Sequence, residues 1–280
     1  MAVNIRVTTL CENTAVKSGF MAEWGLSILV EIDKYKVLFD TGASSVVPHN
    51  AQKLGIDLSS IDKIILSHGH IDHTGGLANI LQFTGKKDVV LHPAAWESKY
   101  TKRPDEDEAA IIGINFTKEA LKFKGAEFIY SREPVEIAKG VVTTGEVEMI
   151  TDYEIIEPNL LVKRENSLQP DTLADDLSLI IDSPKGLIVI SGCAHRGIIN
   201  HLLHAQKLFK GKNIYAVVGG THLSRASEMR IDKTISALKN LDIKKIGVSH
   251  CTGFNATCAL AQAFGDRFFV NSSGTQCELL

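Results

Sequence analysis

The sequence has few aromatic residues, no long apolar run and no excess of charge of one sign. Phe, Trp and Tyr make up 6% of the 280 residues, and 30 Lys plus Arg stand against 33 Asp plus Glu. This balance gives no general attraction to nucleic acid or to an anionic membrane, so neither is expected as a partner. No stretch approaches the roughly 18 apolar residues of a membrane-spanning helix. Residues 1–10 have the pattern of a β-strand and lack the features of a signal peptide.

Cysteine is also sparse. The 5 cysteines are an odd number and are irregularly spaced, whereas the disulfide framework of a secreted protein is denser and usually even-numbered. We therefore expect reduced thiols and a cytoplasmic location. With 44% hydrophobic and 22% charged residues, the composition is that of an ordinary folded protein.

Short apolar segments alternate with helical stretches in both halves of the chain, which predicts an α/β fold with helices covering sheets in layers. Strands are expected at 26–32, 36–40, 63–66, 88–91, 177–181, 187–190, 214–218, 245–248 and 268–270, the last of which would close the chain. Helices are expected near 51–54, 76–83, 198–209, 228–241 and 256–264.

The pattern loosens between the two halves, from about residue 93 to about residue 170. This stretch holds a charged loop at 102–108 and a predicted peripheral strand at 141–144. We interpret 1–280 as a single domain in which 93–170 is an insertion, either a lid over the site or a solvated connection without a catalytic duty.

The most informative segment directly follows the predicted buried strand at 63–66. His68, His70, Asp72 and His73 place three imidazoles and a carboxylate within six residues, and Gly69 and Gly75 allow tight turns there. Crowded at the end of a buried strand, these polar groups would each carry a desolvation cost of a few kcal/mol. A divalent cation removes that cost, and neutral imidazoles and carboxylates are the ligands that such metals prefer.

The segment from His68 to His73 resembles the H-x-H-x-D-H signature of the metallo-β-lactamase superfamily, and Asp40-Thr-Gly42 is similar to that superfamily's first motif. The resemblance implies an αββα sandwich, with two mixed sheets packed face to face and helices on the outer faces. It also implies two metals, one held by His68 and His70 and the other by Asp72 and His73.

Three more histidines follow the ends of later strands, where open α/β sheets place ligands. We expect His195 and His250 to complete the metal ligands. His222 is expected to act as a ligand, as a support of one, as a catalytic contact to substrate together with Asp72, or as a structural residue. His201 and His204 lack such a placement and are expected to be surface or structural residues.

Many superfamily members have Gly-Asp, with the Asp bridging both metals, where this chain has Gly192-Cys193. Either Cys193 coordinates as a thiolate, or Asp176 or Asp175 reaches in from the start of the neighbouring strand. Asp40 is expected to orient a histidine or a backbone turn. Arg196, near the start of a helix, is a candidate contact for an anionic substrate, with a simple salt bridge as the alternative.

Together with the other strand-end motifs, Glu23-Trp-Gly25 and Ser249-His250-Cys251 resemble the branch of the superfamily typified by the synthase that joins a dihydropterin methyl diphosphate to ribofuranosylaminobenzene 5′-phosphate and releases diphosphate. The resemblance implies a metal-dependent enzyme acting on a small phosphorylated molecule. A hydrolase of phosphoesters or other esters is the alternative, and a non-catalytic metal-bound ligand sensor is a third. The cofactor is expected to be one or two zinc ions, with manganese or iron also compatible with these ligands.

Overall fold

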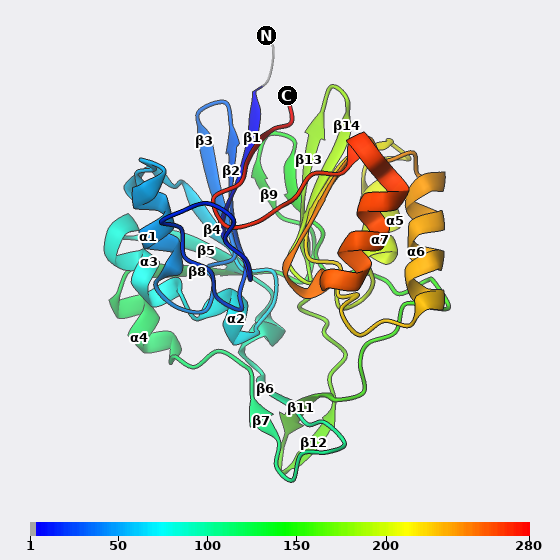
Figure 1. Cartoon of the computed structure of the whole chain (residues 1–280). Coiled ribbons are helices and arrows are strands. Elements are labelled where there is room, and N and C mark those ends of the chain that lie inside the picture. Colours follow the sequence, from blue (N-terminus) through cyan, green and yellow to red (C-terminus); the bar gives the residue numbers. More distant parts are fainter. Residues whose placement is uncertain (1–3) are drawn as a thin grey trace.

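Two β-sheets lie face to face, and each carries helices on its outer surface (Figure 1). The computed structural model describes residues 4–280. The first sheet has the strand order β17-β1-β2-β3-β4-β5-β8. Its strands are β1 (Ile5–Cys11), β2 (Ser27–Ile32), β3 (Tyr35–Phe39), β4 (Lys63–Ile65), β5 (Lys87–Leu91), β8 (Ala126–Tyr130) and β17 (Gln276–Glu278). From β3 to β8 the neighbours are parallel.

The second sheet has the order β16-β15-β14-β13-β10-β9. Its strands are β9 (Glu136–Ala138), β10 (Val141–Thr143), β13 (Ser178–Ser183), β14 (Gly186–Ser191), β15 (Ile214–Gly219) and β16 (Lys245–Val248). β14, β15 and β16 are parallel, so their carboxyl ends lie at one edge of the sheet. The loops after these strands and after β3 and β4 build the site described below.

Apolar side chains alternate along the strands and so supply both faces of each sheet. Along β2, Ile28 and Val30 join the core between the sheets, whereas Leu29 packs beneath the outer helices. The helices of the first half are α1 (Val46–Lys53), α2 (Ile71–Thr74), α3 (Leu77–Thr84) and α4 (Lys118–Phe123). Those of the second half are α5 (Ile198–Leu208), α6 (Glu228–Asn240) and α7 (Phe254–Phe264).

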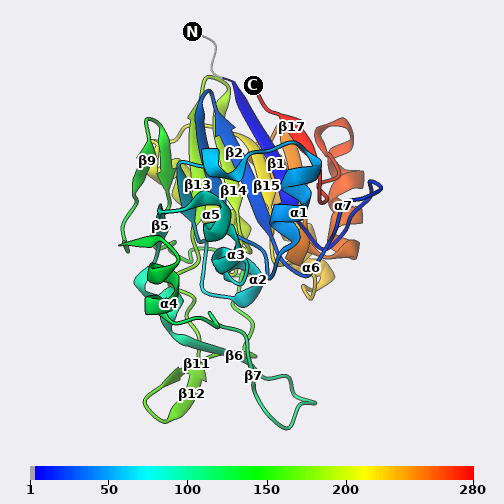
Figure 2. The same ribbon diagram turned by 90° about the vertical axis from the view of Figure 1, so that its left-hand side faces the viewer.

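A third, small sheet projects from one end of the sandwich (Figures 1 and 2). It has the order β12-β11-β6-β7, with β6 (Ser98–Thr101), β7 (Ala110–Ile111), β11 (Leu160–Arg164) and β12 (Ser167–Pro170). The stretch 93–170 is therefore not one continuous insertion, because β8 joins the first sheet and β9 and β10 join the second.

The end of the chain differs from the sequence-based expectation. The predicted strand 268–270 makes only an isolated bridge between Phe268 and Ile246. The closing strand is β17, which pairs antiparallel with β1. Among residues 4–280 no helix is both long and apolar enough to cross a membrane. All five cysteines are free thiols.

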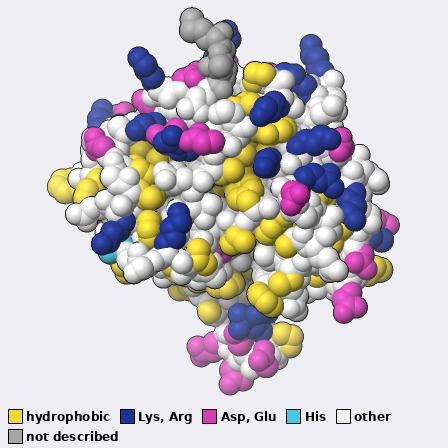
Figure 3. Space-filling model, turned by 45° about the horizontal axis from the view of Figure 1, so that its top comes forward, with side chains coloured by type: hydrophobic (Ala, Val, Ile, Leu, Met, Phe, Trp, Pro, Cys, Tyr) yellow, Lys and Arg dark blue, Asp and Glu magenta, His cyan; other side chains and the backbone are white. Residues whose placement is uncertain are grey.

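The end of the sandwich that bears both termini has a mixed surface. Figure 3 shows Lys and Arg side chains scattered there among Asp, Glu and apolar side chains, and histidines hardly show. The histidines that follow β4, β14 and β16 are buried, at the end of the sheets nearer the small sheet.

Candidate metal centre

The loop from His68 to His73, hereafter the metal loop, runs from the end of β4 into α2. His70 takes extended backbone angles and is the residue before the first turn of α2. Gly69 sits so close to the main chain that a Cβ there would lie 2.1 Å from the Ala95 carbonyl oxygen. Only glycine fits this approach, which explains the glycine between the two histidines.

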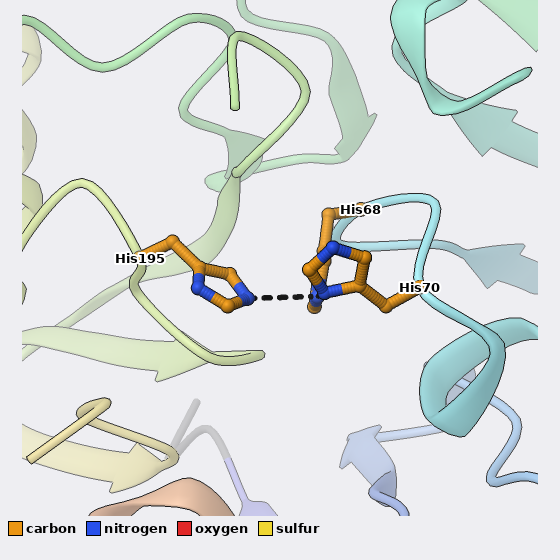
Figure 4. Close-up of side chains that lie close together, drawn as sticks. All are labelled: His68, His70 and His195. Atoms are coloured by element: carbon orange, nitrogen blue, oxygen red, sulfur yellow. Dashed lines mark hydrogen bonds between the residues drawn. The ribbon is translucent and has the colours of Figure 1, made fainter. Parts of the chain in front are cut away.

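Three imidazoles from both halves of the molecule form the first group. Nε2 of His68 lies 2.9 Å from Nδ1 of His70, and Nε2 of His195 lies 3.2 Å from Nε2 of His68. Figure 4 shows His195 reaching His68 and His70 from the opposite side. All three rings are buried. His195 is delivered by the loop after β14, in which Ala194 has a φ of 53°.

A second group lies beside the first. Nε2 of His73 is 3.2 Å from Nε2 of His250, and Oδ2 of Asp72 is 3.4 Å from the same His250 atom. Sγ of Cys193 lies 3.1 Å from Nε2 of His73. The structure thus brings together every residue predicted as a metal ligand, in the two groups His68–His70–His195 and Asp72–His73–His250.

Buried polar partners orient these rings from behind. Oδ2 of Asp40 lies 2.7 Å from Nδ1 of His73, and its carboxylate also accepts hydrogen bonds from the amide and hydroxyl of Ser67. Oδ1 of Asn13 lies 2.8 Å from Nδ1 of His250. With Nδ1 engaged in both rings, Nε2 is the nitrogen that faces the centre, which is the usual arrangement around ligating histidines.

Cys193, rather than Asp176 or Asp175, contributes its side chain to the centre. Its sulfur forms a group with His68 and His73, within 4.8 Å of one another. Oδ2 of Asp176 instead lies 3.1 Å from His201 and accepts a hydrogen bond from the Arg196 amide. His201 is therefore a buried structural residue. Burial raises the pKa of the Cys193 thiol, so its thiolate form requires positive charge nearby.

The donor set fits a divalent cation. Nε2 of His68 lies 2.9 Å from Nδ1 of His70 and 3.2 Å from Nε2 of His195, so three buried ring nitrogens converge where a cation can accept their lone pairs. Burial lowers the pKa of His70 to about 4, so its ring is neutral at pH 7 and has a lone pair to donate. Burial alone would raise the pKa of Asp72, but the neighbouring His73 and His250 lower it, so Asp72 is ionised. Burial lowers the pKa of His73, but Asp40 and Asp72 outweigh it and raise the pKa to about 9, so this ring must release a proton to bind metal. Imidazoles, a carboxylate and a thiol suit zinc, and all but the thiol also suit manganese or iron.

A cavity of about 280 Å³ opens over the two groups. Its wall includes Asp72, Trp24 and His222, and on the side of the small sheet it includes Arg103 and Asn159. Arg225, which follows β15, also lines it, whereas Arg196 is not among the lining residues. The predicted anion contact thus lies away from the cavity, and two arginines that the sequence did not single out take positions on its wall.

His222 stands between the cluster and an acidic residue. Oε2 of Glu157 lies 2.9 Å from Nε2 of His222, while Nδ1 of His222 is buried without a hydrogen-bond partner. Its ring centroid is 4.0 Å from that of His195, and its φ of 49° is unusual for a residue with a side chain. Burial lowers the pKa of His222, but Cys251 and Glu157 outweigh it and raise the pKa to about 10.

Comparison with known proteins identifies the family. A model described as the metallo-beta-lactamase superfamily matches residues 25–159. The 7,8-dihydropterin-6-methyl-4-(β-D-ribofuranosyl)-aminobenzene-5′-phosphate synthase of Methanocaldococcus jannaschii is 37% identical over 95% of this chain and 93% of its own. The chain belongs to the metallo-β-lactamase superfamily. An uncharacterized protein of the same organism is 33% identical over 91% of this chain and 94% of its own.

A solved superfamily structure confirms the fold. Tm1679, described as a metal-dependent hydrolase of the β-lactamase superfamily, is 32% identical, covers 98% of this chain and 99% of its own, and has a TM-score of 0.84. The αββα sandwich predicted from the sequence is therefore correct.

The sequence did not predict several residues that support the metallo-β-lactamase site and lie far from it along the chain. Glu157 contacts His222, Asn13 contacts His250, and Lys99 contacts Asp175 behind the metal loop. None has a spacing that marks it: Glu157 precedes its partner His222 by 65 positions, and Asn13 precedes His250 by 237. Cys251 does have such a signal, its position directly after the predicted ligand His250, and it lines the cavity.

Proposed function

We propose that this chain is a metal-dependent enzyme that joins two small phosphorylated molecules with release of diphosphate. The proposal is supported by the name of the 37% identical relative and by the motifs that this chain shares with the synthase branch. The observation that carries the proposal is the meeting of two ligand groups from both halves of the chain beneath one cavity. The proposed ligands are His68, His70 and His195 for one metal ion, and Asp72, His73 and His250 for the other. Cys193 lies between them.

The bound cation would supply positive charge that neutralises a diphosphate leaving group or makes water more acidic. The chain's own residues prepare that chemistry. Asp40 and Asn13 fix the rings of His73 and His250, so little reorganisation is needed on loading. Burial keeps the His70 ring neutral, which is the form that binds metal.

The substrate's phosphate groups are assigned to the two arginines of the wall. Arg103 comes from the loop after β6 and Arg225 from the loop after β15, so two separate loops bring a guanidinium group to the same cavity. One guanidinium group can donate two parallel hydrogen bonds to the oxygens of one phosphate. Hydrogen bonds between charged groups are also stronger than those between neutral groups. The flat indole of Trp24, 63% exposed and 5.5 Å from the His250 ring, provides a stacking surface for an aromatic ring system.

His222 is assigned the proton transfer. With its pKa raised to about 10 it carries a proton on both nitrogens near neutral pH, and Glu157 holds the Nε2 side. Nδ1 is then free to give its proton to a departing phosphate oxygen. A residue in this role typically contributes about 10²- to 10⁴-fold to the rate.

Hydrolysis of a phosphoester is the second candidate, because Tm1679 is described as a metal-dependent hydrolase and its fold matches over nearly the whole chain. The same ligands and the same His222 would serve it. In the synthase reaction an aryl amine attacks the methylene carbon that carries the diphosphate, a C–N bond forms and the C–O bond breaks. In phosphoester hydrolysis water attacks phosphorus and the ester P–O bond breaks.

One experiment separates these functions. Metal content is measured by elemental analysis, and the loaded protein is incubated with a dihydropterin methyl diphosphate, with and without ribofuranosylaminobenzene 5′-phosphate. Diphosphate release that requires the amine, with the coupled product seen by mass spectrometry, supports the synthase. Release without the amine supports the hydrolase. Loaded protein that consumes neither this substrate nor a panel of phosphoesters contradicts the proposal and favours a ligand sensor.

A further inference from the structure

Lys99 is a buried cation directly behind the metal loop. Its side chain is 0% exposed, although it lies on β6 of the small sheet that projects from the sandwich. Lysine is almost never fully buried unless it is paired. Its ammonium group donates to Oδ2 of Asp171 at 2.8 Å and to Oδ1 of Asp175 at 2.9 Å. One positive and two negative charges leave this triad with a net charge of −1.

Asp175 connects the triad to the metal loop. While Oδ1 accepts from Lys99, Oδ2 accepts a hydrogen bond of 2.7 Å from the amide of Gly69. Gly69 is the residue between His68 and His70, and its backbone position is already fixed by close approach to Ala95. The orientation of the Asp175 carboxylate therefore bears on both neighbouring imidazoles.

The main chain makes a second connection between the same parts. The Ile112 amide donates to the Lys99 carbonyl at 3.0 Å, and the Ile112 carbonyl accepts from the Ile71 amide at 2.8 Å. Gly113 pairs with His70 in an isolated antiparallel bridge. Residues on both sides of His70 are thus tied to the strand that carries Lys99.

We propose that Lys99 and Asp175, together with the Ile112 backbone, form a brace by which the small sheet positions the metal loop. The inference rests on the proposed metal site, and Lys99 and Asp175 are positioning residues that do not themselves hold metal. A buried ion triad is not explained by stability alone, because well-packed apolar residues in such places are often equally stable or more so. Its place, one hydrogen bond from the residue between two ligands, indicates a role in geometry.

The test compares substitutions of a residue that contacts the metal loop, Asp175, with a substitution of one that does not, Asp171. Asp175→Ala removes the acceptor of the Gly69 amide, Asp175→Asn keeps an oxygen there, and Asp171→Asn alters only the remote end of the triad. Each protein is loaded with Co²⁺ alone. The readouts are the dissociation constant, the visible absorption spectrum of the bound Co²⁺, and the thermal midpoint.

We expect Asp175→Ala to weaken Co²⁺ binding about 10- to 100-fold, the usual cost of removing a support behind a metal ligand, and to change the spectrum. Asp175→Asn should lie in between. Asp171→Asn should lower the thermal midpoint yet keep the wild-type spectrum and dissociation constant. If Asp175→Ala does not fold, the comparison of the two Asn variants decides in the same way.

The brace is wrong if the Asp175 variants fold and keep wild-type Co²⁺ affinity and spectrum, or if Asp171→Asn changes them equally. Turnover is not part of this test. A wild-type protein that binds Co²⁺ but fails the diphosphate assay contradicts the proposed reaction, and the variant series still decides the brace.

Discussion

At the scale of single residues, the site depends on which nitrogen of each histidine faces inward. Asp40 and Asn13 engage Nδ1 of His73 and His250 from outside the centre, and Ser67 lies 2.9 Å from Nδ1 of His68. His222 differs, because its Nε2 lies 2.9 Å from Oε2 of Glu157 while its Nδ1 is buried without a hydrogen-bond partner. That difference underlies its assignment as a proton donor.

His222→Gln tests this assignment. We expect kcat to fall about 10²- to 10⁴-fold while the metal content stays at the wild-type level, because glutamine keeps a polar group but cannot transfer the proton. Kinetics and elemental analysis on the same sample check this. A loss of bound metal in this variant would instead make His222 a ligand.

Arg225→Ala tests the contact to phosphate. We expect KM for the diphosphate substrate to rise about tenfold or more, since a hydrogen bond to a charged group is worth roughly 1.5–3 kcal/mol, and kcat to change less. Arg132→Ala is the matched control, because Arg132 is exposed, pairs with Glu146 and does not line the cavity. Equal effects of the two variants would argue against the assignment.

The sequence predicted the centre well because its signal is local. Three histidines and an aspartate within six residues, followed by histidines at strand ends, sufficed to select residues that the fold brings together. Their role as ligands stays a prediction. The contact between Lys99 and Asp175 could not be predicted, because the two residues are 76 positions apart and no sequence pattern links them. The prediction for Arg196 rested on its position near the start of a helix. The Arg196 amide donates to Asp176, and Arg196 does not line the cavity.

At the scale of elements, α5 begins without a capping side chain of its own. The residue before its first turn is Gly197, with a φ of 97°. Glu154, from the distant loop before β11, accepts hydrogen bonds of 2.9 Å from the amides of Ile199 and Asn200. A Cβ on residue 197 would lie 2.3 Å from this carboxylate, so the glycine makes room for the cap.

Glu154→Ala should therefore lower the free energy of unfolding by about 1–3 kcal/mol, because two buried amides lose their acceptor. Urea titration measures it. Glu148→Ala is the control: Glu148 pairs with Lys207 of the same helix but is 64% exposed, so its loss should change stability by less than about 0.5 kcal/mol. Similar losses in both variants would mean that α5 does not depend on this cap.

The sequence predicted the elements whose hydrophobic pattern extends over many residues. It missed a short strand that is defined only by its pairing with another strand. The helices 198–209 and 228–241 agree with α5 and α6 to within one residue. β17 has only three residues and owes its existence to β1, from which it is more than 260 positions away. Conversely, Phe269 at the predicted strand 268–270 packs against Gly247 and makes no ladder.

At the scale of the whole molecule, the two halves of the sandwich each contribute part of both ligand groups. The metal loop belongs to the first half, while His195 and His250 follow β14 and β16 of the second. Bound metal would therefore link the two sheets at one end, and any ligand that binds only the folded state stabilises it.

Removal of metal should then lower the thermal midpoint by about 5 °C or more, since a ligand at 100 times its dissociation constant adds about 2.7 kcal/mol. Calorimetry before and after dialysis against a chelator measures the change, and added Zn²⁺ should restore the midpoint. His70→Ala, which removes one ligand of the first group and leaves the second group intact, should respond less to both treatments than wild type. The control His49→Ala, whose wild-type ring contacts Gly19 away from the centre, should behave as wild type. An unchanged midpoint on chelation would contradict a metal shared between the halves.

The pairing of β17 with β1 places Leu280 next to Ile5, with the Leu280 amide 3.3 Å from the Ile5 carbonyl. Both lie at the end of the sandwich away from the small sheet (Figure 1). A fluorescent fusion partner or a sensor chip attached beyond either residue would thus leave the entrance to the cavity clear. Immobilised protein should admit small ligands as freely as protein in solution, which makes the chain suited to direct binding measurements.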